Sequence, residues 1–356
     1  MSFGKSTYDK VSNKYSFDIK DLDLSIANAI RRIILSEIPT VGFYGEEETT
    51  IQIIENTGPL HDEFMKHRIG LIPIYVSEEI TDEYEDNDYI FELNVINNST
   101  NTINITTNNF TGTYKGKELS KKELNILFPK NEVSDEYILI TRLRSGEQLH
   151  LIAKAIKRTA KTNASFSPVS LANLYYIEDE AESATKDNIL DKQRSYHRNA
   201  YGDPTLIKFE IEPVNNMSHT YLLLTAFKVL QEKLVSLIKS LESNNVMIEP
   251  VQNNPFSFNF HVNDEDDTLG NVIQSLLHNK YIRANKKHKN LVCSYIGYIC
   301  PHPLKKLMII RITIEDQITP DIFSQFLSDN CRDIIKELDG YMKQLEYAGE
   351  ESSTSS

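Results

Sequence analysis

The chain has 356 residues, of which 40% are hydrophobic and 25% are charged, a composition typical of a globular protein with two or three domains. Its net charge of −13 argues against general nucleic-acid binding, which needs many cations to neutralise phosphates, and suits partners with basic surfaces. The three cysteines lack a CxxC pair, which argues against a disulfide framework or a zinc ribbon and indicates a reducing compartment. No apolar run approaches the ~20 residues of a membrane-spanning helix, so we expect a soluble protein.

The N-terminal part of the chain predicts a strand followed by a helix. Residues 14–20 alternate polar and apolar side chains, as a half-buried strand does. From Asp23 the apolar residues recur at steps of three and four and form one helical stripe: Ile26, Ala29, Ile30, Ile33 and Ile34. Pro39 then ends the helix.

The next part of the chain predicts mainly β structure. A short helix over 61–69, which Gly70 is placed to cap, interrupts it. An acidic exposed segment is expected over 77–88, Pro168 closes the β-rich stretch, and a polar surface connection is expected over 177–204. The predicted strands are 41–54, 71–76, 89–96, 102–107, 137–142 and 148–155.

A similar order of elements then recurs towards the C-terminus. A strand over 206–211 precedes a long helix whose apolar residues step by four and three: Leu223, Phe227, Leu230, Leu234, Leu237 and Leu241. The Asn- and Pro-rich segment 249–255 predicts a linker. After it we expect strands over 256–262, 291–299 and 307–314 and helices over 269–277 and 322–345. The Ser- and Glu-rich tail 349–356 predicts disorder.

One short pattern occurs twice, at 18–35 and at 260–277. When Asn28 is aligned with Asn271, the apolar positions coincide and acidic residues precede each copy. The aligned pairs are Ile26/Leu269, Ala27/Gly270, Ile30/Ile273, Ile33/Leu276 and Ile34/Leu277. A repeated helix-opening unit predicts two related domains that pack face to face within one polypeptide.

Neither repeated unit is large enough to bury its helices alone, so we expect both to share a helical core across an approximate twofold axis. At ~1.5–3 kcal/mol for each fully buried large apolar side chain, a handful of shared residues stabilises the pair. The covalent connection adds an effective concentration on the order of millimolar. We expect this pseudo-dimer interface to contain Ile26, Ile30, Ile33, Ile34, Phe227, Leu230, Leu234, Leu269, Val272, Leu276, Phe326, Ile334 and Leu338.

Other polar clusters have both a functional and a structural explanation. The acidic run 264–267 resembles a divalent-metal cluster, but acids before a helix also cap its free amides, which is the favoured interpretation. Cys293, Cys300 and His302 lack ribbon spacing and a fourth ligand, so no metal site is predicted, although zinc at the two cysteines stays open. Basic runs such as 154–161 and 280–289 are usually solvated surface, and here docking to acidic partners is favoured over DNA binding.

Several longer motifs resemble the alpha-type assembly subunits of DNA-dependent RNA polymerases, which are bacterial alpha, its archaeal counterpart and the third-largest eukaryotic subunit. The motifs are Asn28–Pro39, Asn56–Pro73, Leu143–Glu147 and Phe166–Val169. The second half is similar to their small partner, which is the eleventh subunit of polymerase II or its archaeal counterpart. Its motifs are Glu265–Asn271, Gly297–Tyr298 and Pro301–Leu304.

The resemblance implies an α+β fold in which two alpha-type dimerisation domains form an intramolecular pseudo-dimer, the first split by a β-rich insertion. The implied boundaries are 1–44 with 176–248, the insertion 45–175, the linker 249–255, the second domain 256–348 and the disordered tail 349–356. Many family members bind zinc through insertion cysteines, but no cysteine lies between residues 45 and 175 here, so that site is not carried over.

The implied function is that of a non-catalytic platform for polymerase assembly, without a cofactor. Its partners would be the second-largest and largest subunits and small polymerase subunits, with Asn28, Arg31 and Arg32 on the docking face. DNA would be met only through the complex, and no membrane is involved. A fusion of both domains resembles the arrangement in large cytoplasmic DNA viruses, which implies location in the virion and the host cytoplasm.

Two alternatives have a different chemistry. A free-standing dimerisation adaptor would bind a transcription factor in place of a polymerase, and recovery of the large polymerase subunits with a tagged chain separates the two. A metal-dependent hydrolase would use the acidic clusters, and turnover by the purified chain with magnesium or manganese would favour it.

Overall fold

The computed structural model describes residues 2–47, 49–131, 133–243, 245–252, 254–289, 291–302, 304–315 and 319–353. The chain separates into two compact units. We call the unit formed by Met1–Ile34, Ala172–Ile211 and Leu222–Ser356 the dimerisation unit. The insertion unit consists of Leu35–Leu171 and Glu212–Tyr221, so it begins ten residues before the predicted position 45 and ends near the predicted 175.

The first half of the dimerisation unit is a four-stranded sheet with two helices. Its strands, in spatial order, are β1 (Ser2–Asp9), β2 (Lys14–Lys20), β13 (Leu206–Pro213) and β12 (Val169–Tyr176). Its helices are α1 (Leu24–Ser36) and α7 (His219–Glu242), and the connection before β13 contains the short helices α5 (Glu180–Ser183) and α6 (Ile189–Gln193). The apolar stripe predicted for α1 is confirmed, since Ile26, Ile33 and Ile34 are completely buried.

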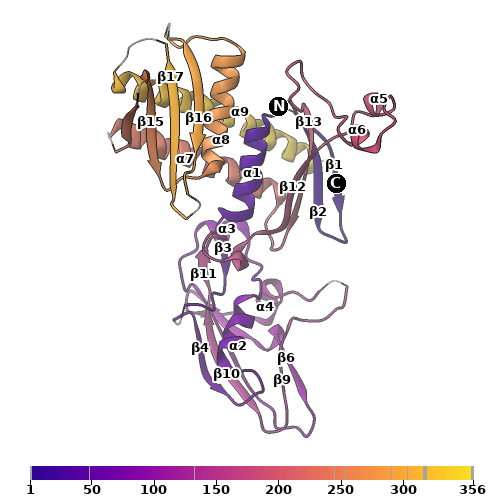
Figure 1. Ribbon diagram of the computed structural model, residues 1–356. Coiled ribbons are helices and arrows are strands. Elements are labelled where there is room, and N and C mark those ends of the chain that lie inside the picture. The colour runs from indigo at the N-terminus through magenta and orange to yellow at the C-terminus, as the bar shows by residue number, and fades with distance from the viewer. Residues whose placement is uncertain are drawn as a thin grey trace. The chain divides into compact units, whose positions relative to one another are not determined.

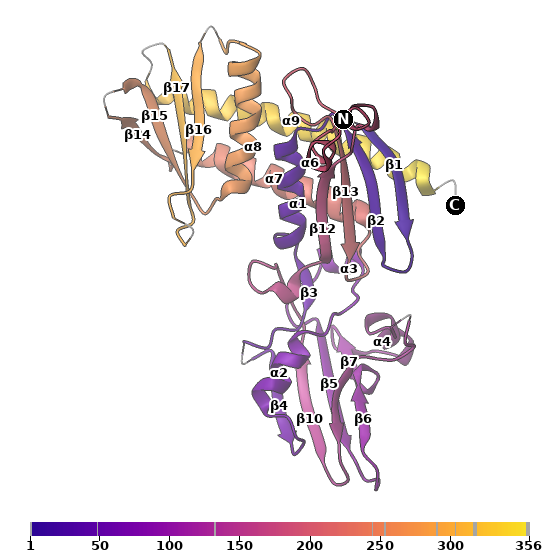
Figure 2. The ribbon, with the colours of Figure 1, turned by 45° about the vertical axis from the view of Figure 1, so that its right-hand side comes forward.

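The second half repeats this arrangement. Its sheet has the spatial order β14 (Met247–Val251), β15 (Asn254–Asn263), β17 (Leu307–Ile314) and β16 (Cys293–Ile299). Its helices are α8 (Asp267–Leu277) and α9 (Pro320–Ser353), and a π-helical segment, η3 (His278–Arg283), continues α8. Figures 1 and 2 show α1 and α8 beside each other between the two sheets. The predicted α+β pseudo-dimer is confirmed.

The equivalence of the halves extends to single residues. Lys20 pairs with Leu206 at the end of β2, and Asn263, its counterpart under the Asn28/Asn271 alignment, pairs with Leu307 at the end of β15. The next residue of each half, Asp21 or Asp264, has a left-handed backbone with φ of 57° or 60°. Aspartate tolerates this conformation better than most residues, so the same turn directs each strand into its helix.

The two long helices also bury equivalent positions. When α7 and α9 are aligned at Leu230 and Ile334, their buried residues coincide. The coincident pairs are Leu222/Phe326, Leu223/Leu327, Leu230/Ile334, Leu234/Leu338 and Leu241/Leu345. Each side chain removed from water in this way contributes ~1.5–3 kcal/mol, so helix packing is a main source of stability in each half.

The insertion unit is β-rich. Its main sheet has the order β4 (Ile51–Asn56), β10 (Gln148–Lys154), β5 (Tyr89–Ile96), β7 (Thr111–Tyr114) and β8 (Lys117–Glu118). Figure 2 labels the first four of these strands. Smaller pairs join β3 (Thr40–Gly42) to β11 (Ile156–Arg158) and β6 (Ile103–Thr106) to β9 (Leu139–Leu143). Its helical segments are α2 (Asp62–Gly70), α3 (Glu78–Asp82), η1 (Thr107–Asn109), α4 (Lys121–Leu127) and η2 (Ala164–Phe166).

Aromatic rings form the centre of the insertion unit. Phe43, Phe91, Phe110 and Phe128 are buried, with ring centroids 5.1–6.3 Å apart. Aromatic pairs at these separations add to the free energy of area burial, so the cluster stabilises the unit.

Some predicted elements differ from the structure. The predicted linker 249–255 is part of the β14–β15 hairpin, the counterpart of the β1–β2 hairpin, and its Asn253 lies outside the described residues. Helix α9 continues to Ser353, so the described part of the predicted disordered tail, 349–353, is helical, and 354–356 lie outside the described residues.

Within the insertion unit, three local predictions are wrong. The segment 77–88, expected to be exposed, contains α3 and the buried Thr81 and Tyr84. Residues 71–76 form no strand, and only Pro73 makes an isolated bridge, to Gly42. Gly70 is the last residue of α2 and does not cap it, because Leu71 occupies the cap position. Glycine avoids crowding here instead, since a Cβ on Gly70 would lie 3.1 Å from the backbone nitrogen of Gly45, which is a tight contact.

Candidate partner interface

Helices α1 and α8 meet through polar side chains at both of their ends. Arg32, near the end of α1, donates from Nε to Thr268 Oγ1 at the start of α8 over 2.9 Å. Asp23, just before α1, accepts from Asn279 Nδ2 at 3.0 Å and Ser275 Oγ at 3.3 Å. Since the start of each helix meets the later part of the other, the helices run antiparallel.

These contacts have the pattern of a twofold interface. Under the Asn28/Asn271 alignment, Arg32 corresponds to Ser275 and Ser25 corresponds to Thr268. Ser25 binds the same carboxylate of Asp23 that Ser275 binds. Both ends of this contact between the two halves, which we call the joint, therefore use equivalent positions. An interface in which the same surface of two related units meets itself is isologous, and here both units belong to one chain.

Helices α7 and α9 form the second part of the joint. Gln231 Nε2 donates to Ile335 O at 3.3 Å and to Asp339 Oδ1 at 2.7 Å. Ile335 is the counterpart of Gln231 when Leu230 is aligned with Ile334, so this contact lies at the pseudo-twofold axis. Away from it, the Phe227 and Tyr341 rings lie with centroids 6.5 Å apart.

A largely buried ion pair connects the two halves. Lys233 Nζ on α7 lies 3.1 Å from Glu265 Oε2, which precedes α8, and the side chains are 12% and 13% exposed. An ion pair with little access to water is destabilising when one partner is removed, because the remaining charge loses its compensation. The pair therefore favours this one relative position, or register, of the two halves.

The apolar residues predicted for the interface are almost all buried. Leu276 is the exception, because it is only half-buried and lines a cleft between the halves, whereas its neighbour Leu277 is 1% exposed. The buried members are Ile26, Ile30, Ile33, Ile34, Phe227, Leu230, Leu234, Leu269, Val272, Phe326, Ile334 and Leu338.

The residues predicted for docking have different surroundings. Arg31 Nε donates to Asn28 Oδ1 at 3.0 Å, which holds both side chains on one half-exposed surface of α1. Burial and, secondarily, the charge of Arg32 lower the pKa of Arg31 from its usual value. Arg32 is instead engaged with Thr268 of the second half, so it belongs to the joint. Asn28 and Arg31 are thus the predicted docking residues that remain clear of this contact.

The acidic run before α8 acts as a helix cap, as predicted. Asp266 accepts from the Thr268 backbone nitrogen at 2.8 Å, which satisfies a free amide of the first turn. Within the described part of the chain, no group of three or more His, Cys, Asp or Glu side chains is arranged to hold a metal ion. Burial raises the pKa of Cys293 to about 12, and burial with the nearby Asp267 raises that of Cys300 to about 11, so both stay protonated at neutral pH.

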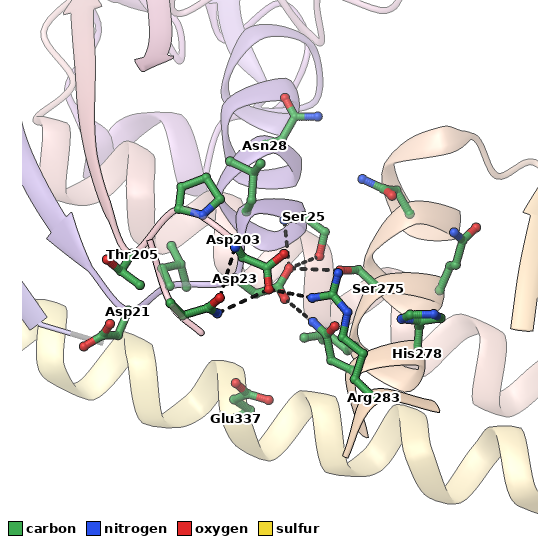
Figure 3. Close-up of a pocket in the computed structure, with 18 of the residues that line it drawn as sticks. Asp21, Asp23, Ser25, Asn28, Asp203, Thr205, Ser275, His278, Arg283 and Glu337 are labelled. Carbon is green, nitrogen blue, oxygen red and sulfur yellow. Dashed lines mark hydrogen bonds and ion pairs between the residues drawn. The ribbon is translucent and has the colours of Figure 1, made fainter. Parts of the chain in front are cut away.

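A cleft of about 910 Å³ opens between the two halves beside α1 and α8 (Figure 3). Asp21, Asp23 and Asn28 line it from the first half, and Ser275 and Arg283 line it from the second. Sequence patterns did not predict this cleft or the contacts of Lys233 and Gln231, because these residues come from segments far apart in the chain. No helix in the described ranges is both long and apolar enough to cross a membrane.

Comparison with known proteins supports this description. The family model of the RNA polymerase Rpb3/Rpb11 dimerisation domain matches residues 16–234, more than half of the chain, and a related model of the same description matches residues 257–344. The two matches correspond to the two halves of the pseudo-dimer, with the insertion inside the first.

Several individual relatives are RNA polymerase subunits. DNA-directed RNA polymerases I and III subunit RPAC1 of Homo sapiens is 28% identical over 185 residues, 47% of this chain and 52% of the human protein. DNA-directed RNA polymerase II subunit RPB3 of Schizosaccharomyces pombe is 25% identical over 285 residues, 71% of this chain and 91% of the yeast protein. The matched region thus spans about half the length of human RPAC1 and most of RPB3. The chain belongs to the family of the RNA polymerase Rpb3/Rpb11 dimerisation domain and contains two such domains.

Proposed function

We propose that this protein is a non-catalytic assembly subunit of a multisubunit DNA-directed RNA polymerase. The observation that carries the proposal is the isologous joint between two family domains within one chain, in which Arg32 binds Thr268 and Asp23 binds Ser275. Separate subunits would need to find one another before assembly, whereas a covalent pair presents a complete platform at any protein concentration. The names of the relatives, RPAC1 and RPB3 subunits, support the assignment to a polymerase.

The proposed role is to dock the second-largest subunit and thereby start assembly before the largest subunit and small subunits join. The docking surface contains Asn28 and Arg31, which are held together by a hydrogen bond and are half-exposed. A partly desolvated arginine, already oriented by an amide, loses little side-chain freedom on binding and forms strong hydrogen bonds to a partner carboxylate. In this role the chain contributes no group to the nucleotidyl-transfer site and needs no cofactor.

The proposal includes a viral setting, because fusion of the two domains resembles the arrangement in large cytoplasmic DNA viruses. Transcription would then take place in the host cytoplasm, with the enzyme packaged in the virion. Mass spectrometry of purified virions tests this part separately, since a cellular polymerase subunit would be missing from them.

Affinity recovery of a tagged chain from cells that make the complete polymerase tests the docking surface. The wild-type chain is expected to recover the second-largest and largest subunits. Arg31→Glu reverses the charge at the surface and is expected to reduce this recovery about tenfold or more, since charge-assisted hydrogen bonds contribute about 1.5–3 kcal/mol. Arg194→Glu makes the same change at an exposed position of the same unit and serves as the control.

Both variants should unfold at the wild-type temperature, because neither arginine is buried in a core. If Arg31→Glu recovers the large subunits as well as Arg194→Glu does, the docking surface lies elsewhere. If even the wild-type chain recovers no polymerase subunit, the assembly role itself is wrong.

A further inference from the structure

The cleft between the halves breaks the pseudo-twofold symmetry of the joint. At one end, the Arg32 side chain spans from α1 to Thr268 at the start of α8. At the other end, the position equivalent to Arg32 is Ser275, whose short side chain reaches Asp23 with its hydroxyl alone. The cleft of about 910 Å³ lies at this second end (Figure 3).

Carboxylates dominate the charge of the cleft. Among the described residues that line it, Asp21, Asp23, Asp203 and Glu337 are acidic, Arg283 is the permanent cation, and His278 also faces it. Arg283 Nη1 lies 2.5 Å from Asp203 Oδ2 at one side of the cleft, which compensates that carboxylate. The remaining acids are more numerous than the cations that face them, so the cleft has a negative potential.

Asp23 is the acidic residue at the centre of this arrangement. Among the described residues, its hydrogen-bond donors are the neutral Ser25, Ser275 and Asn279. Burial, followed by the hydrogen bond to Glu337 and the charges of Glu337 and Asp23, raises the pKa of Tyr341 at the cleft wall. A carboxylate held in place by neutral donors is a preorganised acceptor for an incoming cation.

We propose that the cleft receives an arginine side chain from a basic segment of a partner protein. At the equivalent end of the joint, the chain itself places a guanidinium, that of Arg32. A guanidinium has five donors in a planar fork, which suits the several carboxylate oxygens of the residues that line the cleft. Nucleic acids and acidic peptides are excluded because the same carboxylates repel them.

This site is independent of the proposed polymerase function, because its recognition chemistry can be measured with a short peptide. The probe is acetyl-Gly-Arg-Gly-amide, and the matched control is the same peptide with citrulline, which has the shape of arginine without its charge. Nuclear magnetic resonance of the full chain with labelled leucine methyl groups is the measurement, since Leu276 lines the cleft. The arginine peptide is expected to shift the Leu276 signals and to bind about tenfold more tightly than the citrulline peptide.

Variants test whether the arginine peptide binds in the cleft. Glu337→Gln removes a cleft carboxylate and is expected to weaken the arginine peptide several-fold, whereas Glu346→Gln, an exposed change on the same helix, leaves it unchanged. Ser275→Arg places an internal guanidinium in the cleft and is expected to abolish binding without lowering the melting temperature, while Ser275→Gln retains binding. If Ser275→Arg does not fold, the comparison of Glu337→Gln with Glu346→Gln decides the proposal.

Three results would overturn the proposal. The first is equal affinity for the citrulline and arginine peptides. The second is an effect of Glu346→Gln as large as that of Glu337→Gln, or signals that shift far from Leu276. The third is displacement of the peptide by an equal concentration of spermidine, which would show a general attraction for cations in place of an arginine site.

Discussion

Loss of Lys233 tests the joint between the halves most directly. In Lys233→Met an unbranched side chain of nearly the same length remains but the charge is lost, and the largely buried Glu265 then faces an apolar group. Breaking a fully buried ion pair costs about 3–5 kcal/mol of unfolding free energy. Since the two side chains keep 12% and 13% of their surface in water, we expect about 2–4 kcal/mol here.

The assay is urea unfolding followed by circular dichroism, in a double-mutant cycle with Glu265→Gln. The double variant leaves no uncompensated charge, so it should be more stable than Lys233→Met alone. Lys228→Met is the matched control, because Lys228 is exposed on the same helix, and its change should cost less than about 0.5 kcal/mol. An equal cost for both lysines, or a cycle without coupling, would refute the interpretation of this pair as the contact that favours one register.

Other predictions follow from single contacts. Leu277→Asp buries a charge and should lower the melting temperature strongly, whereas Leu276→Asp, at the half-buried neighbouring position, should lower it far less; equal effects would contradict the assigned helix face. Asp266→Ala removes the cap of α8 and should cost about 1 kcal/mol, which Asp266→Asn should largely restore in urea unfolding. The hydrogen bond from Lys280 lowers the pKa of Asp333, so its stabilisation exists above about pH 4 and is lost as the pH falls through the folded-state pKa. Lys280→Met should therefore flatten the acid limb of a stability–pH curve, and an unchanged limb would show that this pair contributes nothing.

Periodic apolar patterns predicted the helices that form the core. The stripes of α1, α7, α8 and α9 are each visible in the sequence, because burial of one helix face requires apolar residues at steps of three and four. The strands that were not predicted include β1, β12 and β14, whose exposed polar residues obscure the apolar alternation, and the short strands β7, β8 and β11. Helix α4 also escaped, although Ser120 and Glu123 form a capping box that is recognisable in a sequence.

The candidate site was predictable only in part. The motif beginning at Asn28 pointed to α1, but its arginines are chemically alike in sequence and differ only in what surrounds them. Arg31 turns back to Asn28 within its own helix, whereas Arg32 meets Thr268 more than two hundred positions away. Local spacing reports which residues share a helix face, and it contains no information about the helix that will cover that face.

The sequence by itself determined that the chain contains two related units, because a repeated apolar pattern means that an equivalent helix face is buried in each. Tertiary structure decided how they meet: the antiparallel crossing of α1 and α8, the contact of Gln231 with its own counterpart Ile335, and the Lys233–Glu265 pair. It also decided that one end of the joint is occupied by Arg32 and the other is an acidic cleft. The physical reason is that burial depends on local pattern and is recorded in each helix, whereas hydrogen bonds and ion pairs depend on distances between segments that only the folded chain brings together.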